Sequence, residues 1–202
     1  MNGTMLESPE NGLWHVEVDT PIGLLRAVAS GAAIVGLYHG HHEPAPTLDR
    51  LGLRSAIDGL ASLSVKRESG GEVEVIPPVP AAALLLEAGR ELEEYFAGSR
   101  RSFEVPLELG GTPFQARVWT ALNAIPYGER RSYRDIAEQL GNPSMGRAIG
   151  AAVRANPVSI MVPGHRVVSA TGAVVGYAAG TAIKTALLEL EMSCTATLTP
   201  QP

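Results

Sequence analysis

Cysteine is nearly absent: the 202-residue chain contains one, Cys194. A single cysteine excludes an internal disulfide framework and any zinc cluster built from several thiolates. Long apolar runs are also lacking, since none approaches the roughly 18 residues that a membrane-spanning helix needs. Residues Met1 to Asn11 lack the charged-then-apolar pattern of a signal peptide. We therefore expect a cytoplasmic protein with no membrane partner.

Positive charge is in the minority, because 16 basic residues face 21 acidic ones and the net charge is -5. That balance alone argues against a nucleic-acid partner. The distribution argues the other way. Thr112–Lys184 contains 8 basic and 3 acidic residues, or +5, which leaves 8 basic and 18 acidic residues, or -10, in the remainder. A basic half and an acidic half are typical of a polyanion-binding module beside a separate domain, with chance asymmetry as the alternative.

Strand-like and helix-like patterns both occur in the first half of the chain. Trp14, Val16 and Val18 alternate with polar neighbours, which is typical of a half-buried strand. The same reasoning predicts strands at Leu24–Ala29, Ala33–Tyr38 and Val73–Ile76, and helices at Thr47–Leu63 and Ala81–Phe96. These elements together predict a mixed α/β (α+β) fold.

Three histidines, His39, His41 and His42, lie close together after the third predicted strand. Such spacing could hold a metal ion, but no acidic or cysteine ligand stands at a tight spacing beside them. We favour a solvated loop, and metal binding by these histidines stays open. The sequence otherwise predicts no metal and no cofactor.

Helix start and stop signals become strong in the second half. In Thr112–Gln115 a capping threonine precedes a proline at the first helical position and a glutamine at the third. Two further helices are predicted, from Ser132 to Leu140 and from Met145 to Ala155, with Gly141 in the turn between them. Two short helices joined by a glycine-containing turn are the helix-turn-helix plan.

The segment after these helices fits a winged version of that plan. Val167–Val175 is predicted as a hairpin with Thr171–Gly172 at its tip, and Thr181–Glu191 as a last helix. Arg147 and Arg154 lie on the face of the second helix that its apolar positions leave free. The pattern favours DNA binding, although the same plan occurs in proteins that bind no nucleic acid.

Seven short motifs in the second half carry a resemblance to one family. In chain order they are Gly111–Gln115, Val118–Trp119, Ile125–Gly128, Ser132–Tyr133, Arg147–Gly150, Asn156–Pro157 and Pro163–Val167. In this order and spacing the chain resembles the O6-alkylguanine-DNA alkyltransferases, also called methylated-DNA–protein-cysteine methyltransferases. The resemblance implies a ribonuclease-H-like α/β domain over residues 1–105. It also implies a winged helix-turn-helix DNA-binding domain over 106–192, followed by a tail over 193–202.

The resemblance also implies how DNA is contacted. The family binds duplex DNA by the minor groove and turns the damaged base out of the stack. An arginine at the position of Arg147 fills the gap, and a tyrosine at the position of Tyr133 helps to turn the nucleotide out. Arg134 and Arg154 are candidates for phosphate contact. The implied partner is double-stranded DNA that contains O6-alkylguanine.

A pocket for the extruded base is implied as well. Tyr177 would line it, with backbone groups near Gly164, Val167 and Ala178 reading the edge of the base. Asn156 would be the hinge between the recognition helix and the reactive loop. These assignments rest on the resemblance.

The position of the nucleophile departs from the family pattern. Active members use the cysteine of a Pro-Cys-His-Arg motif, activated through a histidine and a glutamate that match His165 and Glu191. This chain has Gly164 at that position, and a glycine has no side chain to accept an alkyl group. Cys194 lies three residues past Glu191, so we expect no alkyl transfer by the chain as it stands.

Three functions remain open at this point. The first is a lesion-recognition protein, similar to the alkyltransferase-like proteins, that binds O6-alkylguanine and hands it to nucleotide excision repair proteins. The second is a suicide methyltransferase whose acceptor cysteine has been replaced. The third is a winged-helix transcription regulator that flips no base. All three imply DNA binding, and we expect a monomer.

Overall fold

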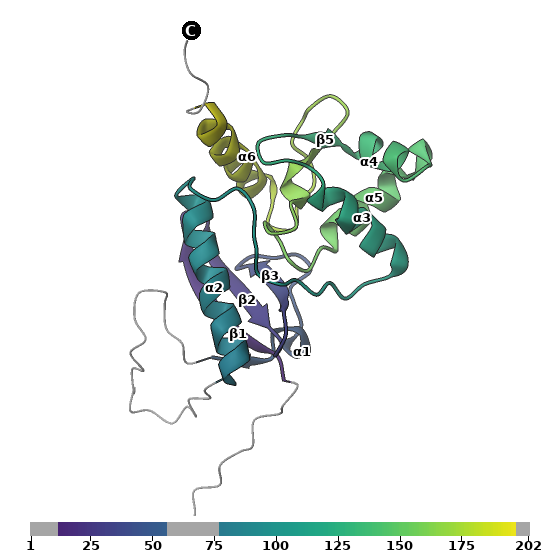
Figure 1. Ribbon diagram of the computed structural model, residues 1–202. Coiled ribbons are helices and arrows are strands. Elements are labelled where there is room, and N and C mark those ends of the chain that lie inside the picture. Colours follow the sequence, from purple (N-terminus) through teal and green to yellow (C-terminus); the bar gives the residue numbers. More distant parts are fainter. Residues whose placement is uncertain (1–11, 56–76, 197–202) are drawn as a thin grey trace, which may run out of the picture.

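The computed structural model of the protein describes residues 12–55 and 77–196. Its N-terminal part is a sheet whose strands run in the order β3-β2-β1-β4 (Figure 1). The strands are β1 (Trp14–Thr20), β2 (Gly23–Ala29), β3 (Ile34–His39) and β4 (Leu53–Arg54). Strand β2 pairs in antiparallel orientation with both β1 and β3, and β4 pairs in parallel with β1. The predicted strands near the N-terminus are therefore confirmed.

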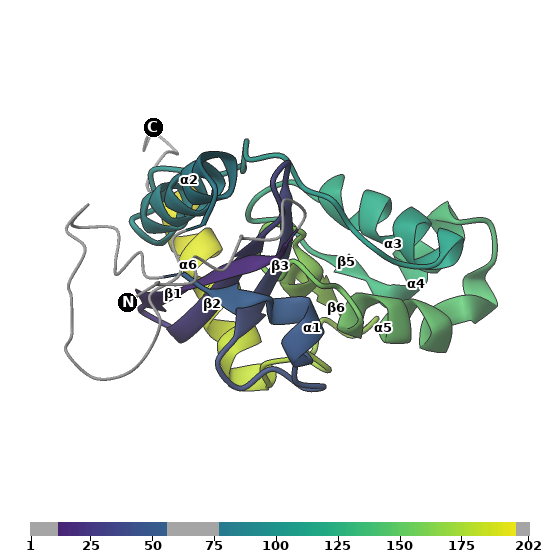
Figure 2. The same ribbon diagram turned by 90° about the horizontal axis from the view of Figure 1, so that it is seen from below.

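Helix α2 (Val79–Phe96) lies along one face of this sheet, as Figure 2 shows. Its apolar side chains Ala81, Leu85, Ala88 and Leu92 are fully buried, and they recur at helical spacing. The helix stops before Gly98, which adopts a φ of 77° that favours glycine. The predicted helix over Ala81–Phe96 is confirmed within two residues at its start.

The predicted helix over Thr47–Leu63 is wrong in its extent. Helix α1 covers Leu48–Leu51 only, and Gly52 ends it with a φ of 66°. A Cβ at Gly52 would lie 2.0 Å from the backbone oxygen of Leu13, so the chain passes too close to β1 for any side chain there. The segment then joins the sheet as β4. Residues 56–63 and the predicted strand Val73–Ile76 lie outside the described residues.

The C-terminal part consists mainly of helices, with two short strands between them (Figure 1). Its elements are α3 (Pro113–Asn123), β5 (Arg131–Ser132), α4 (Tyr133–Gln139), η1 (Pro143–Met145), α5 (Gly146–Arg154), η2 (Gly164–Arg166), β6 (Val167–Val168) and α6 (Thr181–Ala196). Both α3 and α4 begin with a complete capping box, on Thr112 and Ser132. Helices α4 and α5 are the predicted helix-turn-helix pair, with Gly141 at a φ of 92° between them.

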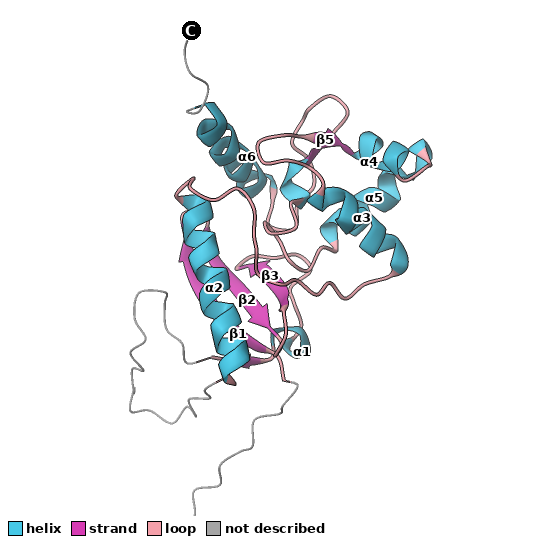
Figure 3. Cartoon of the chain, in the orientation of Figure 1, coloured by secondary structure: helices cyan, strands magenta, loops and turns pink. Residues whose placement is uncertain are grey.

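The predicted wing hairpin over Val167–Val175 does not form as a strand pair. Only Val167–Val168 is a strand, and it pairs in parallel with β5. A tight turn follows, in which the Ser169 amide donates to the Ala173 carbonyl over 3.0 Å, and the rest is loop (Figure 3). The Ser169 hydroxyl also accepts a hydrogen bond from the Ala173 amide in this turn. This side-chain bond satisfies the amide locally and so competes with the backbone bonds of a two-stranded hairpin.

Helix α6 continues to Ala196, five residues beyond the predicted end at Glu191. Cys194 therefore lies on this helix and not in an irregular tail. The domain limits at 105/106 and 192/193 stay predictions. No helix in the described part of the chain is long and apolar enough to cross a membrane.

The two parts share one edge of the sheet. Strand β3 forms isolated bridges from Ile34 to Leu107 and from Leu37 to Val158. One buried core runs through side chains of both parts, including Trp14 of β1 and Trp119 of α3. The N-terminal sheet therefore supports the segment that follows α5 directly, through backbone hydrogen bonds.

Candidate functional site

Gly164 begins the short helix η2 and is buried. A Cβ built at Gly164 would lie 3.3 Å from Cγ1 of Val153 and 3.7 Å from Nδ2 of Asn156. The first contact is tight and the second is ordinary van der Waals contact, so a small side chain fits with a slight shift of Val153. The site therefore has room for a side chain that this sequence does not supply.

Asn156 closes the loop between α5 and η2. Its Nδ2 donates to the Val162 carbonyl over 2.8 Å, and its Oδ1 accepts from the Val158 amide over 3.0 Å. Inside the loop, Ile160 adopts a φ of 69°, which is unfavourable for a β-branched residue. The buried amide of Asn156 thus holds a tight, strained turn directly before the Gly164 position.

Glu191 is the centre of a buried hydrogen-bond network. Its Oε1 lies 2.8 Å from Nε2 of His165, and its Oε2 accepts from Nε of Arg166 over 2.9 Å. The Tyr95 hydroxyl and the Gly128 amide donate to the same carboxylate over 2.8 Å and 3.0 Å. Three separate segments, α2, the loop at Gly128 and η2, thus converge on one carboxylate of α6. The sequence indicated His165 and Glu191, but gave no signal for Tyr95 or for the ion pair of Arg166.

The network determines the charge on each member. Burial raises the pKa of Glu191, but the hydrogen bond from His165 and the pairing with Arg166 outweigh burial and lower it to about 2. Burial lowers the pKa of His165, so the imidazole is neutral at neutral pH. A neutral ring beside a carboxylate carries its proton on Nε2. The Nδ1 of His165 has no hydrogen-bond partner among the residues that the structure describes, so its lone pair faces no protein donor there.

Tyr177 lies in the loop that precedes α6 and meets the end of β3. Its hydroxyl is 3.1 Å from Nε2 of His39, and the next residue, Ala178, accepts from the Glu43 amide over 2.8 Å. The solvated-loop interpretation of the histidines is therefore wrong for two of them: His39 and His42 are 4% and 6% exposed. They are buried because Tyr38 and Tyr177 pack against them.

A different set of side chains faces solvent on α4 and α5. Arg147 and Arg154 are exposed, and neither forms an ion pair with any acidic side chain in the part of the chain that the structure describes. Arg134 is exposed as well, but its Nε donates to Glu138 over 2.7 Å. These three arginines form the surface that we call the basic face.

Tyr133 joins the basic face to the loop before α6. It is half-buried, and its hydroxyl donates to the Val175 carbonyl over 3.2 Å. The buried Lys184 donates to the same carbonyl over 2.8 Å, and its Nζ lies 5.6 Å from the centre of the Tyr133 ring. Burial lowers the pKa of Lys184 to about 8. Tyr133 and Lys184 therefore hold one side of the loop that carries Tyr177.

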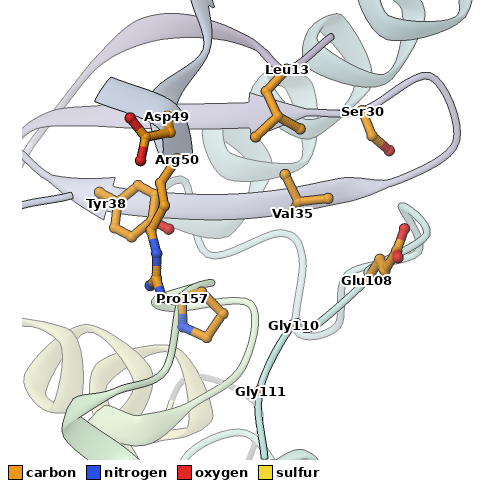
Figure 4. Close-up of a pocket in the computed structure, with 10 residues that line it drawn as sticks. All are labelled: Leu13, Ser30, Val35, Tyr38, Asp49, Arg50, Glu108, Gly110, Gly111 and Pro157. Atoms are coloured by element: carbon orange, nitrogen blue, oxygen red, sulfur yellow. The ribbon is translucent and has the colours of Figure 1, made fainter. Parts of the chain in front are cut away.

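A surface pocket of about 510 Å³ lies away from these residues. Its lining consists of Leu13, Ser30, Val35, Tyr38, Asp49, Arg50, Glu108, Gly110, Gly111 and Pro157. Figure 4 shows Arg50 extending from α1 past Tyr38 toward Pro157. The pocket contains none of the predicted site residues. No group of three or more histidine, cysteine or acidic side chains suited to a metal ion occurs among residues 12–55 and 77–196.

Comparisons with known proteins identify the family of the chain. A sequence model described as "6-O-methylguanine DNA methyltransferase, DNA binding domain" matches residues 113–193. A methylated-DNA–protein-cysteine methyltransferase of Methanosarcina acetivorans is 55% identical over 108 residues, which are 54% of this chain and 69% of that protein. The constitutive enzyme of that name from Bacillus subtilis is 52% identical over 108 residues, or 53% of this chain and 66% of that protein.

Solved structures extend the similarity to nearly the whole chain. The O6-methylguanine methyltransferase of Mycobacterium tuberculosis superposes with a TM-score of 0.69 at 37% identity, over 90% of this chain and 93% of that one. A structure of Mycobacterium tuberculosis OGT in complex with DNA superposes with the same TM-score of 0.69, and the match covers 94% of that chain.

The mixed α/β fold, the helix-turn-helix pair and the buried His165–Glu191 contact define a protein of the DNA alkyltransferase class. The chain belongs to the O6-alkylguanine-DNA alkyltransferase family, the methylated-DNA–protein-cysteine methyltransferases. The resemblance and the fold class predicted from the sequence are thereby confirmed.

Proposed function

We propose that the protein binds duplex DNA containing O6-alkylguanine, turns the damaged base out of the stack, and transfers no alkyl group. The observation that supports the proposal is that Gly164 has no side chain while its neighbours are hydrogen-bonded. Asn156 lies beside Gly164 and bonds the Val162 carbonyl, and His165, the next residue, bonds Glu191.

The basic face supports contact with DNA. Arg147 and Arg154 are exposed on α5 and are not neutralised by a described acidic neighbour, so they are available to phosphates or to a gap in the base stack. Gly146 lies on the same helix, and a Cβ there would meet nothing within 4 Å, which allows close approach of the backbone to a groove. Turning a base out of the stack costs a few kcal/mol, and the cost is lowest for a weakened base pair. A protein that turns bases out therefore binds a damaged base pair in preference to an undamaged one.

The remaining cysteine does not replace the missing acceptor in this proposal. Its sulfur packs against Gly98 at the end of α2, where a Cβ would come within 2.5 Å of it. The neighbours of the Gly164 position are Val153 and Asn156 instead. An alkyl group on bound guanine would therefore stay on the DNA, and an excision pathway would have to remove it. Nucleotide excision repair proteins are the partners we propose for that step.

A second candidate is a suicide methyltransferase lineage in which the acceptor alone has been replaced. The room for a Cβ at Gly164 and the unpartnered Nδ1 of His165 favour it. The two candidates predict the same complex with DNA and differ only in the evolutionary origin of Gly164. The same titration therefore tests the DNA complex that both require.

The test is a titration of the full chain with fluorescent duplexes that carry either O6-methylguanine or guanine at one position. A 2-aminopurine neighbour reports unstacking, and radiolabelled methylated DNA reports transfer. We expect tighter binding and an unstacking signal with the lesion, and no label on the protein. Equal affinity for both duplexes without an unstacking signal would refute base flipping, and stoichiometric labelling would refute the absence of transfer.

A further inference from the structure

Residues at the end of β3 reach across to the loop that carries Tyr177. The rings of Tyr38, His42, His39 and Tyr177 follow one another in contact. Centroid distances are 5.2 Å from Tyr38 to His42, 6.3 Å from His42 to His39, and 5.4 Å from His39 to Tyr177. Tyr177 is therefore packed against the N-terminal part and not only against its own helix-turn-helix unit.

The Tyr177 hydroxyl has two hydrogen-bonding neighbours. Its oxygen lies 3.1 Å from Nε2 of His39, and the side chain of Ser159 hydrogen-bonds it as well. Burial, aided by the nearby His42 and His165, lowers the pKa of His39 to about 3, so its ring is neutral. Each nitrogen of a neutral imidazole forms one hydrogen bond, as donor or as acceptor.

Backbone hydrogen bonds from the same segment hold both loops around Gly164. The Leu37 amide donates to the Pro157 carbonyl over 2.8 Å, and the Ser159 amide donates to the Leu37 carbonyl over 3.0 Å. The Glu43 amide donates to the Ala178 carbonyl over 2.8 Å. Residues 37–43 thus tie the hinge loop after Asn156 to the loop of Tyr177, and His39 makes the side-chain contact between them.

We propose that His39 is a positioning residue for lesion binding: its 3.1 Å hydrogen bond with Tyr177 fixes the phenol ring at the site where the proposed function places the extruded base. The inference rests on that proposed function, and it assigns the N-terminal part a share in lesion preference. His39 acts through Tyr177 and contacts no base itself.

The test compares His39→Leu, which removes the hydrogen-bonding nitrogen, with His39→Gln, whose amide can donate to or accept from the same hydroxyl. His39→Leu is expected to reduce the preference for O6-methylguanine duplex over guanine duplex about fivefold, the effect of one lost neutral hydrogen bond. Affinity for the guanine duplex is expected to stay unchanged, and His39→Gln is expected to restore most of the preference.

Two controls separate positioning from general destabilisation. His42→Phe keeps a buried ring in the same segment without touching the Tyr177 hydroxyl, and it is expected to leave lesion preference unchanged. In the double variant of His39→Leu with Tyr177→Phe, the loss is expected to be no larger than in Tyr177→Phe alone, because Tyr177→Phe already removes the bond to His39. Additive losses, or equal losses of affinity for both duplexes, would overturn the inference.

A second measurement keeps the inference distinct from the proposed function. Amide hydrogen exchange of residues 173–180 in the DNA-free protein is expected to rise in His39→Leu but not in His39→Gln or His42→Phe. If the unaltered protein shows no lesion preference, the proposed function fails while this exchange pattern still decides whether His39 holds the loop. Unchanged exchange in His39→Leu would refute the positioning role in either case.

Discussion

His165 and Glu191 are joined by a buried hydrogen bond of 2.8 Å, although the residue before His165 is a glycine. The carboxylate holds the proton of the imidazole on Nε2, and Nδ1 has no partner in residues 12–55 and 77–196. The same carboxylate also binds Tyr95 of α2 and the Gly128 amide. Glu191 therefore joins the two parts of the chain, so the network has a structural role that does not require alkyl transfer.

Restoring the acceptor tests whether the rest of the site is competent. In Gly164→Cys the new Cβ meets only Cγ1 of Val153 closely, at 3.3 Å, so we expect the variant to fold. The free Nδ1 of His165 can take the thiol proton, directly or through a water molecule, and the thiolate sulfur then displaces guanine from the alkyl carbon. We expect one methyl group per protein from radiolabelled methylated DNA.

The matched control is Gly164→Ser, which has nearly the same shape and a far weaker nucleophile. It is expected to bind the lesion and to take up no label. A Gly164→Cys protein that folds and binds lesion DNA, yet stays unlabelled, would show that the site has lost more than its acceptor.

The depressed pKa of Glu191 predicts a loss of stability in acid. The pKa of Glu191 is about 2 in the folded protein, against an ordinary value of 4.5. The contribution of Glu191 to the free energy of unfolding is therefore fully present above pH 4.5 and is lost as the pH falls through about 2. Its size is on the order of 3 kcal/mol. Urea unfolding of the protein at a series of acidic pH values measures this.

Glu191→Gln is the comparison for the acid-stability prediction. It leaves the buried guanidinium of Arg166 without its partner, so we expect lower stability near neutral pH, by about 3 kcal/mol or more. We also expect a flatter dependence on pH than in the unaltered protein. Parallel pH curves for the two proteins would show that another carboxylate is responsible.

Two variants of Tyr133 separate its ring from its hydroxyl. Tyr133→Phe loses the 3.2 Å bond to the Val175 carbonyl, but Lys184 donates to that carbonyl as well, over 2.8 Å. We therefore expect a small loss of lesion affinity, about threefold or less. Tyr133→Ala also removes the ring beside Lys184 and is expected to weaken both affinity and the unstacking signal more strongly. Equal effects of the two variants would instead locate the role in the hydroxyl.

Local features of this fold were predictable from the sequence, and contacts between distant segments were not. The capping box of Thr112 with Gln115 lies within one turn, so the start of α3 could be predicted. Helix α1 is short because Gly52 meets the backbone of Leu13, a contact that no local pattern reveals. His39 is buried for the same kind of reason, since its partner Tyr177 lies 138 residues away.

The candidate site shows the same limit. Motif similarity indicated the residues on either side of Gly164, because they are close in sequence. Tyr95 lies 96 residues from Glu191 and follows an ordinary helical pattern, so only the folded chain reveals that it completes the network. The arginines predicted to contact DNA are exposed, and their role stays a prediction; the pairing of Arg134 with Glu138 could be assigned only from the structure.

That pairing leads to a graded prediction for the basic face. Arg154 has no described acidic partner, whereas Arg134 must leave Glu138 before it can bind a phosphate. Each phosphate contact contributes about 0.9 to the slope of log affinity against log salt. Arg154→Ala is therefore expected to lower the slope by roughly that amount for both duplexes. Arg134→Ala is expected to lower it less, because its ion pair already offsets part of the charge.

Arg147→Ala is expected to behave differently from both. If this side chain fills the space that the extruded base leaves, its loss removes a contact made only in the flipped complex. The preference for O6-methylguanine over guanine and the 2-aminopurine signal should then fall together, while the salt slope changes little. Titrations of the three variants at several salt concentrations, with both duplexes, measure all of these quantities. An Arg147→Ala protein that loses salt slope but keeps its lesion preference would assign Arg147 to phosphate contact and leave the gap-filling role without a residue on α5.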